Sequence, residues 1–200
     1  MEDQQPPGAY DRPPAPQSQA LRSATPLTPP DERGTAQAAE SAEAAEGSFC
    51  RGFTELAEHA AVSTSGSCAA AVTLTDPAGG PLAEAPGGRA SAVTHPEVSE
   101  LVAVQWESEE GPVPAALESG RPVLVRDVRH ETRWPRYRAM ALQRGLRACA
   151  TLPFRHEGAV LTVSVYAFHP DGLTGVVEEK RAELAGLAEK VVRSRGQGAQ

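Results

Sequence analysis

Residues 106–158 decide the fold, and they read WESEEGPVPAALESGRPVLVRDVRHETRWPRYRAMALQRGLRACATLPFRHEG. Residues 122–128, PVLVRDV, predict a strand whose side chains point to alternating faces. Residues 134–144 predict a helix, because Pro135 suits the first helical turn and Gly145 suits the position after the last one. A strand followed by a short helix is therefore the local unit on which the rest is built.

Two more helices are predicted before this strand. From Pro96 onwards the pattern is helical, and one helical face carries Val98, Leu101, Val102, Gln105 and Trp106. The pair Gly111-Pro112 interrupts that helix, and residues 114–119 form a second, shorter one that Gly120 stops.

Two strands and a long helix are predicted after it. Residues 146–154 and 159–168 are apolar runs joined by Arg155-His156-Glu157-Gly158, a connection whose length and glycine favour a hairpin. Residues 175–193 predict the last helix, in which a heptad-like seam is formed by Val177, Leu184, Leu187 and Val191.

The domain begins with a helix and a strand. Phe53, Leu56, Ala57 and Ala60 have the spacing of an amphipathic helix that ends near residues 63–66. Residues 68–75 predict a strand, and after the turn at 76–80 a short strand at 82–85 is expected to pair back with it. Strands joined by hairpins at both ends of the chain favour a largely antiparallel sheet and hence an α+β fold.

Residues 1–47 differ in composition from the rest. They hold eight of the 18 prolines and very few large apolar side chains, so they are predicted to be a disordered tail. Within them residues 36–46 are rich in Ala and Glu and are expected to form at most a transient helix. The predicted organisation is a tail at 1–47, one domain at 48–194 and a disordered end at 195–200.

Charge and hydropathy exclude some classes of function. Of the net charge of -7, the first 47 residues carry -5 (8 acidic, 3 basic) and the remainder -2 (18 acidic, 16 basic). The domain therefore has no basic excess of the kind that direct nucleic-acid binding requires. The start is acidic and proline-rich, unlike a signal peptide, and no apolar run is long enough to span a bilayer, so a cytoplasmic location is expected. The absence of Ile and Asn suggests a GC-rich bacterial genome.

Cysteine and histidine positions favour neither a metal site nor a disulfide framework. Cys50, Cys68 and Cys149 are odd in number and far apart, and no CxxC motif is present. The five histidines include no pair at the i, i+4 spacing of helical metal ligands, so no bound metal is expected.

The stretch 106–158 resembles the GAF domains of actinobacterial regulators, many of which precede an RNA-binding ANTAR domain. The matching residues are Glu110-Gly111-Pro112, Ala116-Leu117, Gly120, Val125, Asp127, Arg133-Trp134-Pro135, Tyr137 and Gly145. The likeness covers roughly residues 49–193. It implies a central antiparallel sheet of five or six strands flanked by helices, which binds a small molecule such as a cyclic nucleotide, haem or a bilin, or which dimerises. Which cofactor or ligand is bound stays open.

This chain departs from the family at two points. Val113 stands where the family often has a cysteine, so covalent or redox chemistry is not expected there. No ANTAR-like segment follows the last helix, so the usual RNA-binding output is expected to be missing.

Candidate ligand-binding residues follow from the resemblance and from their place in the pattern. They are Trp106, Val113, Trp134, Tyr137, Cys149 and Thr151. Trp134 is expected either to cover a ligand cavity or to pack its helix against the strand at 122–128. Cys149 is interpreted as a small buried side chain, with a reactive or bilin-attaching thiol as the alternative.

The seam of the last helix has two possible partners. Val177, Leu184, Leu187 and Val191 either pair with a second copy of the chain, as a homodimer, or pack on the domain's own sheet. The sequence leaves both open.

The functional prediction is a non-catalytic sensory domain that binds a small molecule or a regulatory protein in bacterial signal transduction or gene regulation. One alternative is a small redox enzyme, similar to free methionine sulfoxide reductases, in which Cys68 and Cys149 would meet. Another is a remnant of an RNA-binding antitermination regulator that acts by pairing with full-length relatives.

Overall fold

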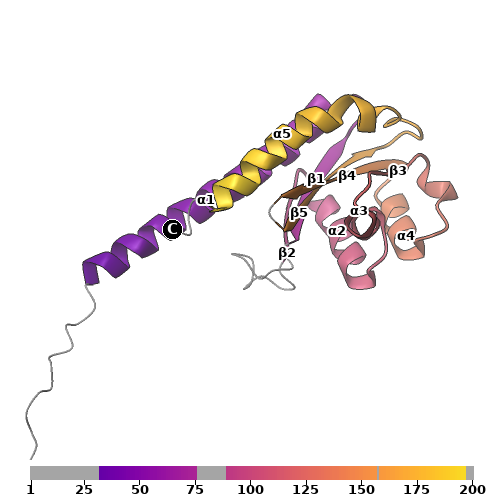
Figure 1. The fold of residues 1–200 in the computed structure, drawn as a ribbon. Coiled ribbons are helices and arrows are strands. Elements are labelled where there is room, and N and C mark those ends of the chain that lie inside the picture. The colour runs from indigo at the N-terminus through magenta and orange to yellow at the C-terminus, as the bar shows by residue number, and fades with distance from the viewer. Residues whose placement is uncertain (1–31, 76–88, 157, 197–200) are drawn as a thin grey trace, which may run out of the picture.

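The computed structural model describes residues 32–75, 89–156 and 158–196, and Figure 1 shows their arrangement. The elements follow the predicted order of helix, two strands, two helices, strand, helix, two strands and helix. They are α1 (Glu32–Ser63), β1 (Ala69–Thr75), β2 (Arg89–Val93), α2 (Pro96–Ser108), α3 (Pro112–Ser119), β3 (Val123–Val125), the 3-10 turn η2 (Val128–His130), α4 (Pro135–Gln143), β4 (Ala148–His156), β5 (Ala159–Ala167) and α5 (Val176–Gly196).

The strands form one five-stranded sheet in the order β2-β1-β5-β4-β3. Every neighbouring pair is antiparallel, including the central pair of β1 with β5, whose register joins Ala69 to Tyr166 and Thr75 to Val160. The predicted α+β class and the antiparallel sheet of five or six strands are therefore confirmed.

Helices cover both faces of the sheet. In Figure 1, α1 and α5 lie side by side across one face, while α2, α3 and α4 lie on the other. Two separate cores result. The larger lies beneath α1 and α5 and includes Val72, Leu161, Val163 and Leu184. The smaller lies beneath α2 and α4 and includes Leu101, Tyr137, Cys149 and Tyr166.

The buried face of α1 follows the apolar stripe that the sequence predicts. Its predicted stripe of Phe53, Leu56, Ala57 and Ala60 is buried, and the helix ends at Ser63 as expected. It begins at Glu32, however, so residues 32–47, which composition assigns to the tail, are helical here. Figure 1 shows this part of α1 extending past the end of α5. Residues 1–31 and 197–200, the rest of the predicted disordered ends, lie outside the described residues.

The hairpin of β4 and β5 agrees with its prediction. The register runs from Ala148 opposite Ala167 to His156 opposite Ala159, and Gly158 takes a φ of 86° at the turn. A positive φ of this kind carries no steric penalty for glycine. Every residue of β5 is buried, because this strand is central and both of its faces are covered.

Two strands differ from expectation. The partner of β1 is β2, at Arg89–Val93, and the strand expected at residues 82–85 lies outside the described residues. The strand expected at 122–128 is shorter, because β3 ends at Val125. The Asp127 side chain accepts a hydrogen bond from the Arg129 N–H (3.0 Å) and so starts the turn η2 in place of a continued strand.

Candidate ligand-binding site

The face of the sheet beneath α2 and α4 carries hydroxyl groups. Successive side chains of a strand point to opposite faces, so the residues that alternate with the apolar core of α1 and α5 all point here. Four of them are fully buried hydroxyl residues, and we call this group the hydroxyl layer: Thr73, Thr151, Thr162 and Ser164.

The hydroxyl layer is paired within itself. Thr73 and Thr162 face each other across β1 and β5, and their Oγ1 atoms are 2.7 Å apart. Thr151 and Ser164 face each other across β4 and β5, with 2.9 Å between their hydroxyl oxygens. Each buried hydroxyl therefore has a hydrogen-bond partner, as a buried polar group requires.

Two tyrosines beside this layer are not paired. Tyr166 comes from β5 and Tyr137 from α4, and both side chains are fully buried. Neither hydroxyl has a hydrogen-bond partner among the described residues. Ser164 and Gln105 lie near the Tyr166 hydroxyl and act to lower its pKa, but neither is in hydrogen-bonding geometry with it. A buried hydroxyl without a partner costs about 1–3 kcal/mol, so these two groups need an explanation.

Cys149 lies between the tyrosines and the hydroxyl layer. Its Sγ is 3.6 Å from Thr151 Oγ1. Burial raises the pKa of Tyr137 and of Tyr166 well above the usual range, and the electrostatic interaction with Cys149 raises both further. Burial also raises the pKa of the Cys149 thiol to about 11, while the nearby Thr151 and Tyr137 hydroxyls act in the opposite direction to a smaller extent. At neutral pH it is a thiol, which fits a small buried side chain better than a reactive thiolate.

Gln105 fixes the connection between α2 and α3. Its Oε1 accepts the Val113 N–H (3.0 Å) and its Nε2 donates to the Leu101 carbonyl (3.0 Å). Gly111 has a φ of 139°, and a Cβ there would come within 2.5 Å of the Gln105 side chain. Val113 is consequently buried against α2, and the sequence pattern alone did not indicate that Gln105 holds it.

Trp134 lies between solvent and Tyr137. It precedes α4, and its ring meets the ring of Tyr137 edge-on, with 6.2 Å between centroids and an angle of 87°. The Arg133 guanidinium covers its other side at 4.1 Å from the ring centroid. Arg133 is held in turn by the buried Glu131, with 2.6 Å between Nη2 and Oε2. Trp134 is thus half-buried in the position of a cover over Tyr137, and the same contact packs it on α4.

Trp106 packs against the same core as Tyr137 and Cys149, from the end of α2. It is half-buried at the end of α2, and the Arg89 guanidinium of β2 lies 4.5 Å from its ring centroid. The structure therefore brings together Tyr137, Cys149 and Thr151, with Trp134 beside Tyr137. Val113 is linked to this group indirectly: its N–H donates to Gln105, and the Gln105 side chain lies near Tyr166.

Cys68 and Cys149 are too far apart for a disulfide. Cys68 precedes β1 and Cys149 lies on β4, so the whole of β5 separates them. Strands are spaced by about 4.8 Å, which places the two Cα atoms roughly 9–10 Å apart. A disulfide needs less than about 7 Å. The Cys68 thiol instead donates to the Tyr166 carbonyl (3.3 Å), and burial raises its pKa.

The seam of α5 is divided between the core and the surface. Leu184 and Val191 are buried in the core beneath α1 and α5, and Leu187 packs against that core while partly exposed. Val177 is half-buried near the edge strand β3. Part of the seam therefore packs on the domain itself.

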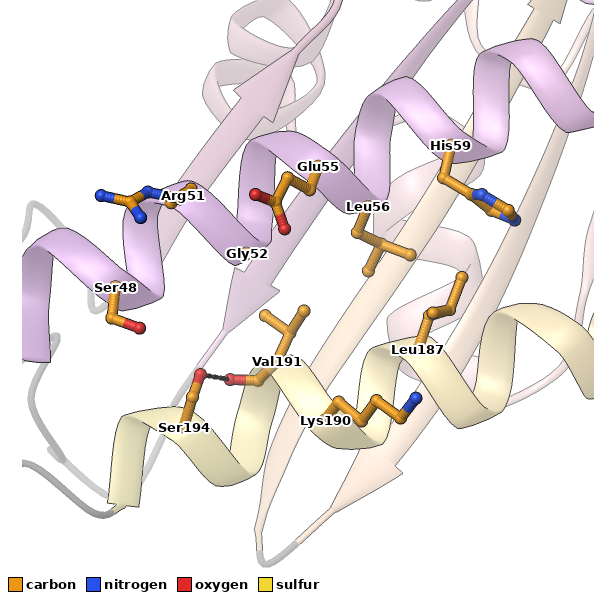
Figure 2. Close-up of a pocket in the computed structure, with 10 residues that line it drawn as sticks. All are labelled: Ser48, Arg51, Gly52, Glu55, Leu56, His59, Leu187, Lys190, Val191 and Ser194. Atoms are coloured by element: carbon orange, nitrogen blue, oxygen red, sulfur yellow. Dashed lines mark hydrogen bonds between the residues drawn. The ribbon is translucent and has the colours of Figure 1, made fainter.

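A groove lies between α1 and α5, with a volume of about 400 Å³. Figure 2 shows Leu56, Leu187 and Val191 pointing into it from the two helices. Its rim is polar, and the residues there are Ser48, Arg51, Glu55, His59, Lys190 and Ser194. Glu183 of α5 reaches across to α1, with 2.6 Å between its Oε1 and His59 Nε2.

Within the described part of the chain, no group of three His, Cys, Asp or Glu side chains is arranged to hold a metal ion. No helix among those residues has the length and apolar content to cross a membrane.

Solved structures with some likeness to this chain include three bacterial proteins. The crystal structure of CepR2, an N-acylhomoserine lactone dependent LuxR family transcription factor from Burkholderia cenocepacia, is similar with a TM-score of 0.50 and 14% identity, over 77% of this chain and 92% of that one. SdiA of Escherichia coli has a TM-score of 0.48 and 16% identity, over 66% and 55% of the two chains. The GAF domain region of a protein from Geobacter sulfurreducens PCA has a TM-score of 0.41 and 20% identity, over 64% and 82%.

At such low identities these likenesses concern the fold alone. No curated protein sequence matches the chain. The family model described as GAF domain, however, matches residues 53–191. Since this match spans more than half of the chain and includes both helical layers and the sheet, the protein belongs to the GAF domain family.

Proposed function

We propose that this GAF domain is a non-catalytic sensor that binds a small molecule beside the hydroxyl layer, in bacterial signal transduction or gene regulation. The observation that carries the proposal is the pair of buried hydroxyls on Tyr137 and Tyr166 that have no partner among the described residues. A bound molecule with hydrogen-bonding groups would remove this penalty, and Trp134 would cover it. Functional sites are the usual place for such local costs in stability.

Redox catalysis by cysteines is less well supported. A nucleophilic thiol and a resolving thiol must come within bonding distance, and the strand β5 separates Cys68 from Cys149. Burial raises the pKa of both thiols, which lowers the thiolate fraction that such chemistry needs. The cysteines are free, which suits the reducing cytoplasm where we place the protein.

We also propose that the groove between α1 and α5 is the surface at which two copies pair. Leu187 is a partly exposed apolar side chain in this groove, and a two-fold axis along it would let each copy cover the same residues of the other. The rim carries both signs of charge, with Arg51 and Lys190 against Glu55, so a rotated copy can match it.

Native mass spectrometry of the full chain purified from a bacterial host tests both parts. We expect the mass of a dimer together with a reproducible small-molecule mass. The Leu187→Glu variant should shift the protein to monomer and keep the small molecule. The Tyr137→Phe/Tyr166→Phe variant should lose the small molecule and stay dimeric. A bare protein from several hosts contradicts the ligand proposal, and a wild-type monomer at micromolar concentration contradicts the dimer.

A further inference from the structure

Positive charge is concentrated in one part of the domain. Residues 96–120 hold six glutamates and no arginine or lysine, whereas residues 121–156 hold an excess of seven positive charges (9 arginines, 2 acidic residues). Three of the nine arginines form ion pairs, with Glu100, Asp127 and Glu131 as the partners. The other six have no ion pair among the described residues: Arg121, Arg126, Arg129, Arg136, Arg138 and Arg155.

A groove at the edge of the sheet collects part of this charge. It lies between β3 and the start of α5, has a volume of about 800 Å³, and is called the β3 groove below. Arg121 and Arg126, which flank β3, line it from one side, and Arg181 of α5 lines it from the other. All three side chains are exposed, and Arg181 also has no ion pair within the described part of the chain. The charge of these guanidinium groups is therefore available to a partner.

The β3 groove also contains apolar side chains. Pro122 and Leu124 line it from the strand and Val177 from the helix. Because α5 packs mainly over β4 and β5, the outer strand β3 is incompletely covered on this side, and Leu124 and Val177 are both half-buried. Arginines around partly exposed apolar groups are a composition typical of protein–protein contacts.

Two carboxylates in the β3 groove are partly offset by the helix itself. Glu178 and Glu179 belong to the first turn of α5, where the partial positive charge of a helix start stabilises carboxylates. Glu179 is turned back towards that start, with its Oε1 3.1 Å from the position that a Cβ on Gly175 would take. Three arginines against these two glutamates leave the groove positive.

We propose that the β3 groove is the docking surface for an acidic segment of a partner protein. An apolar side chain of that segment would rest on Leu124 and Val177, while its carboxylates would pair with the three arginines of the groove. A nucleic acid fits less well, because a phosphate backbone gains nothing from the apolar side chains and is repelled by the two glutamates. This surface goes beyond the proposed function, since it provides the sensor with a site for an output partner.

Fluorescence anisotropy of labelled probes tests this with the full chain. The first probe is a short peptide of glutamates with one central leucine. In the second the leucine is replaced by serine, and in the third every glutamate is replaced by glutamine. A single-stranded oligothymidine of the same net charge as the first peptide is the nucleic-acid control.

We expect the glutamate–leucine peptide to bind best. The serine peptide should bind roughly tenfold more weakly, because it cannot bury an apolar side chain, and the glutamine peptide should not bind measurably. The variant Arg126→Gln/Arg181→Gln should weaken binding of the first peptide by about tenfold or more. The variant Arg129→Gln/Arg136→Gln has the same net charge but changes exposed arginines that do not line the groove, so it should weaken binding by less than about twofold at physiological salt.

The other outcomes would overturn the inference. A wild-type protein that does not bind the glutamate–leucine peptide at millimolar concentration has no docking surface for acidic segments. Equal losses in the two double variants would show that the attraction comes from net charge and not from the groove. Equal binding of the serine peptide would exclude a contribution of Leu124 and Val177. If the oligothymidine binds as tightly as the peptide, the groove recognises a phosphate backbone and the partner is a nucleic acid.

Discussion

The two faces of the sheet are built from the same strands and have opposite chemistry. Towards α1 and α5, β5 presents Leu161, Val163 and Val165, all fully buried in an apolar core. Towards α2 and α4, it presents Thr162, Ser164 and Tyr166, equally buried. Because apolar burial is the main source of stability, the first face holds the domain together. The second face buries polar groups in place of apolar ones and so contributes less stability. A face of this kind is where a recognition site is expected.

The largest effect should come from the apolar face. Leu161→Ala removes a fully buried side chain beneath α1 and α5 and leaves a cavity there. We expect the free energy of unfolding to fall by about 2–5 kcal/mol, measured by urea denaturation. Val160→Ala, on the opposite face of the same strand and outside the core beneath α1 and α5, is the matched control with a smaller loss. An equal loss in both variants would contradict the assignment of stability to this face.

A smaller effect is expected within the hydroxyl layer. Thr151→Val leaves the Ser164 hydroxyl buried without its partner, which should lower the free energy of unfolding by about 1–3 kcal/mol. The double variant Thr151→Val/Ser164→Ala removes both hydroxyls and should recover most of this loss. If the double variant is the less stable of the two, the hydroxyls are not paired as described.

The tyrosine pair should respond in the opposite direction. Tyr137→Phe or Tyr166→Phe removes a buried hydroxyl that has no partner, so we expect the ligand-free protein to be unchanged or stabilised by up to about 1–2 kcal/mol. Thermal unfolding of the protein freed of small molecules measures this. A loss above about 1 kcal/mol would mean that the hydroxyl has a partner even without ligand.

The smallest effect concerns pH at the margin of the second face. A side-chain hydrogen bond from Arg147, followed by the Arg129 N–H, lowers the pKa of Asp127 from 3.8 to about 2. A depressed pKa in the folded state contributes stability above pH 4 and loses it as the pH falls towards 2. In Asp127→Asn the free energy of unfolding should fall less between pH 4 and pH 2 than in the wild type. The difference should be less than about 1 kcal/mol, since the pair is partly exposed. An unchanged profile in denaturation at pH 5 and pH 2 would show that the pair is screened by solvent.

The fold was predictable from the sequence because its strongest patterns are long. The stripe around Phe53, the hairpin closed at Gly158 and the helix that begins near Val176 each combine periodicity with a clear end signal. The strand β2 was missed because Arg89–Val93 has two small alanines and a single valine, and its place is fixed by pairing with β1. Tertiary pairing of this kind leaves no local signal.

The site was predictable only in part. Tyr137, Cys149 and Thr151 were among the candidates and lie together, whereas Tyr166 and Gln105 were not among them. The signal for Tyr166 was present, because Thr162, Ser164 and Tyr166 put a polar group at every second position of a strand otherwise made of Val, Leu and Ala. That Gln105 is engaged at both ends of its amide depends on where α3 packs, which no spacing along α2 reveals.

The neighbourhood of α1 and α5 has a consequence for how the domain is made in the cell. The helices α1 and α5 pack against each other, and β1 pairs with β5. The N-terminal elements of the domain therefore complete their packing only when the C-terminal elements are present. During synthesis the apolar side of the sheet lacks part of its cover until α5, with Leu184, Ala188 and Val192, has been translated. Contacts this distant along the chain make folding slow and late relative to translation.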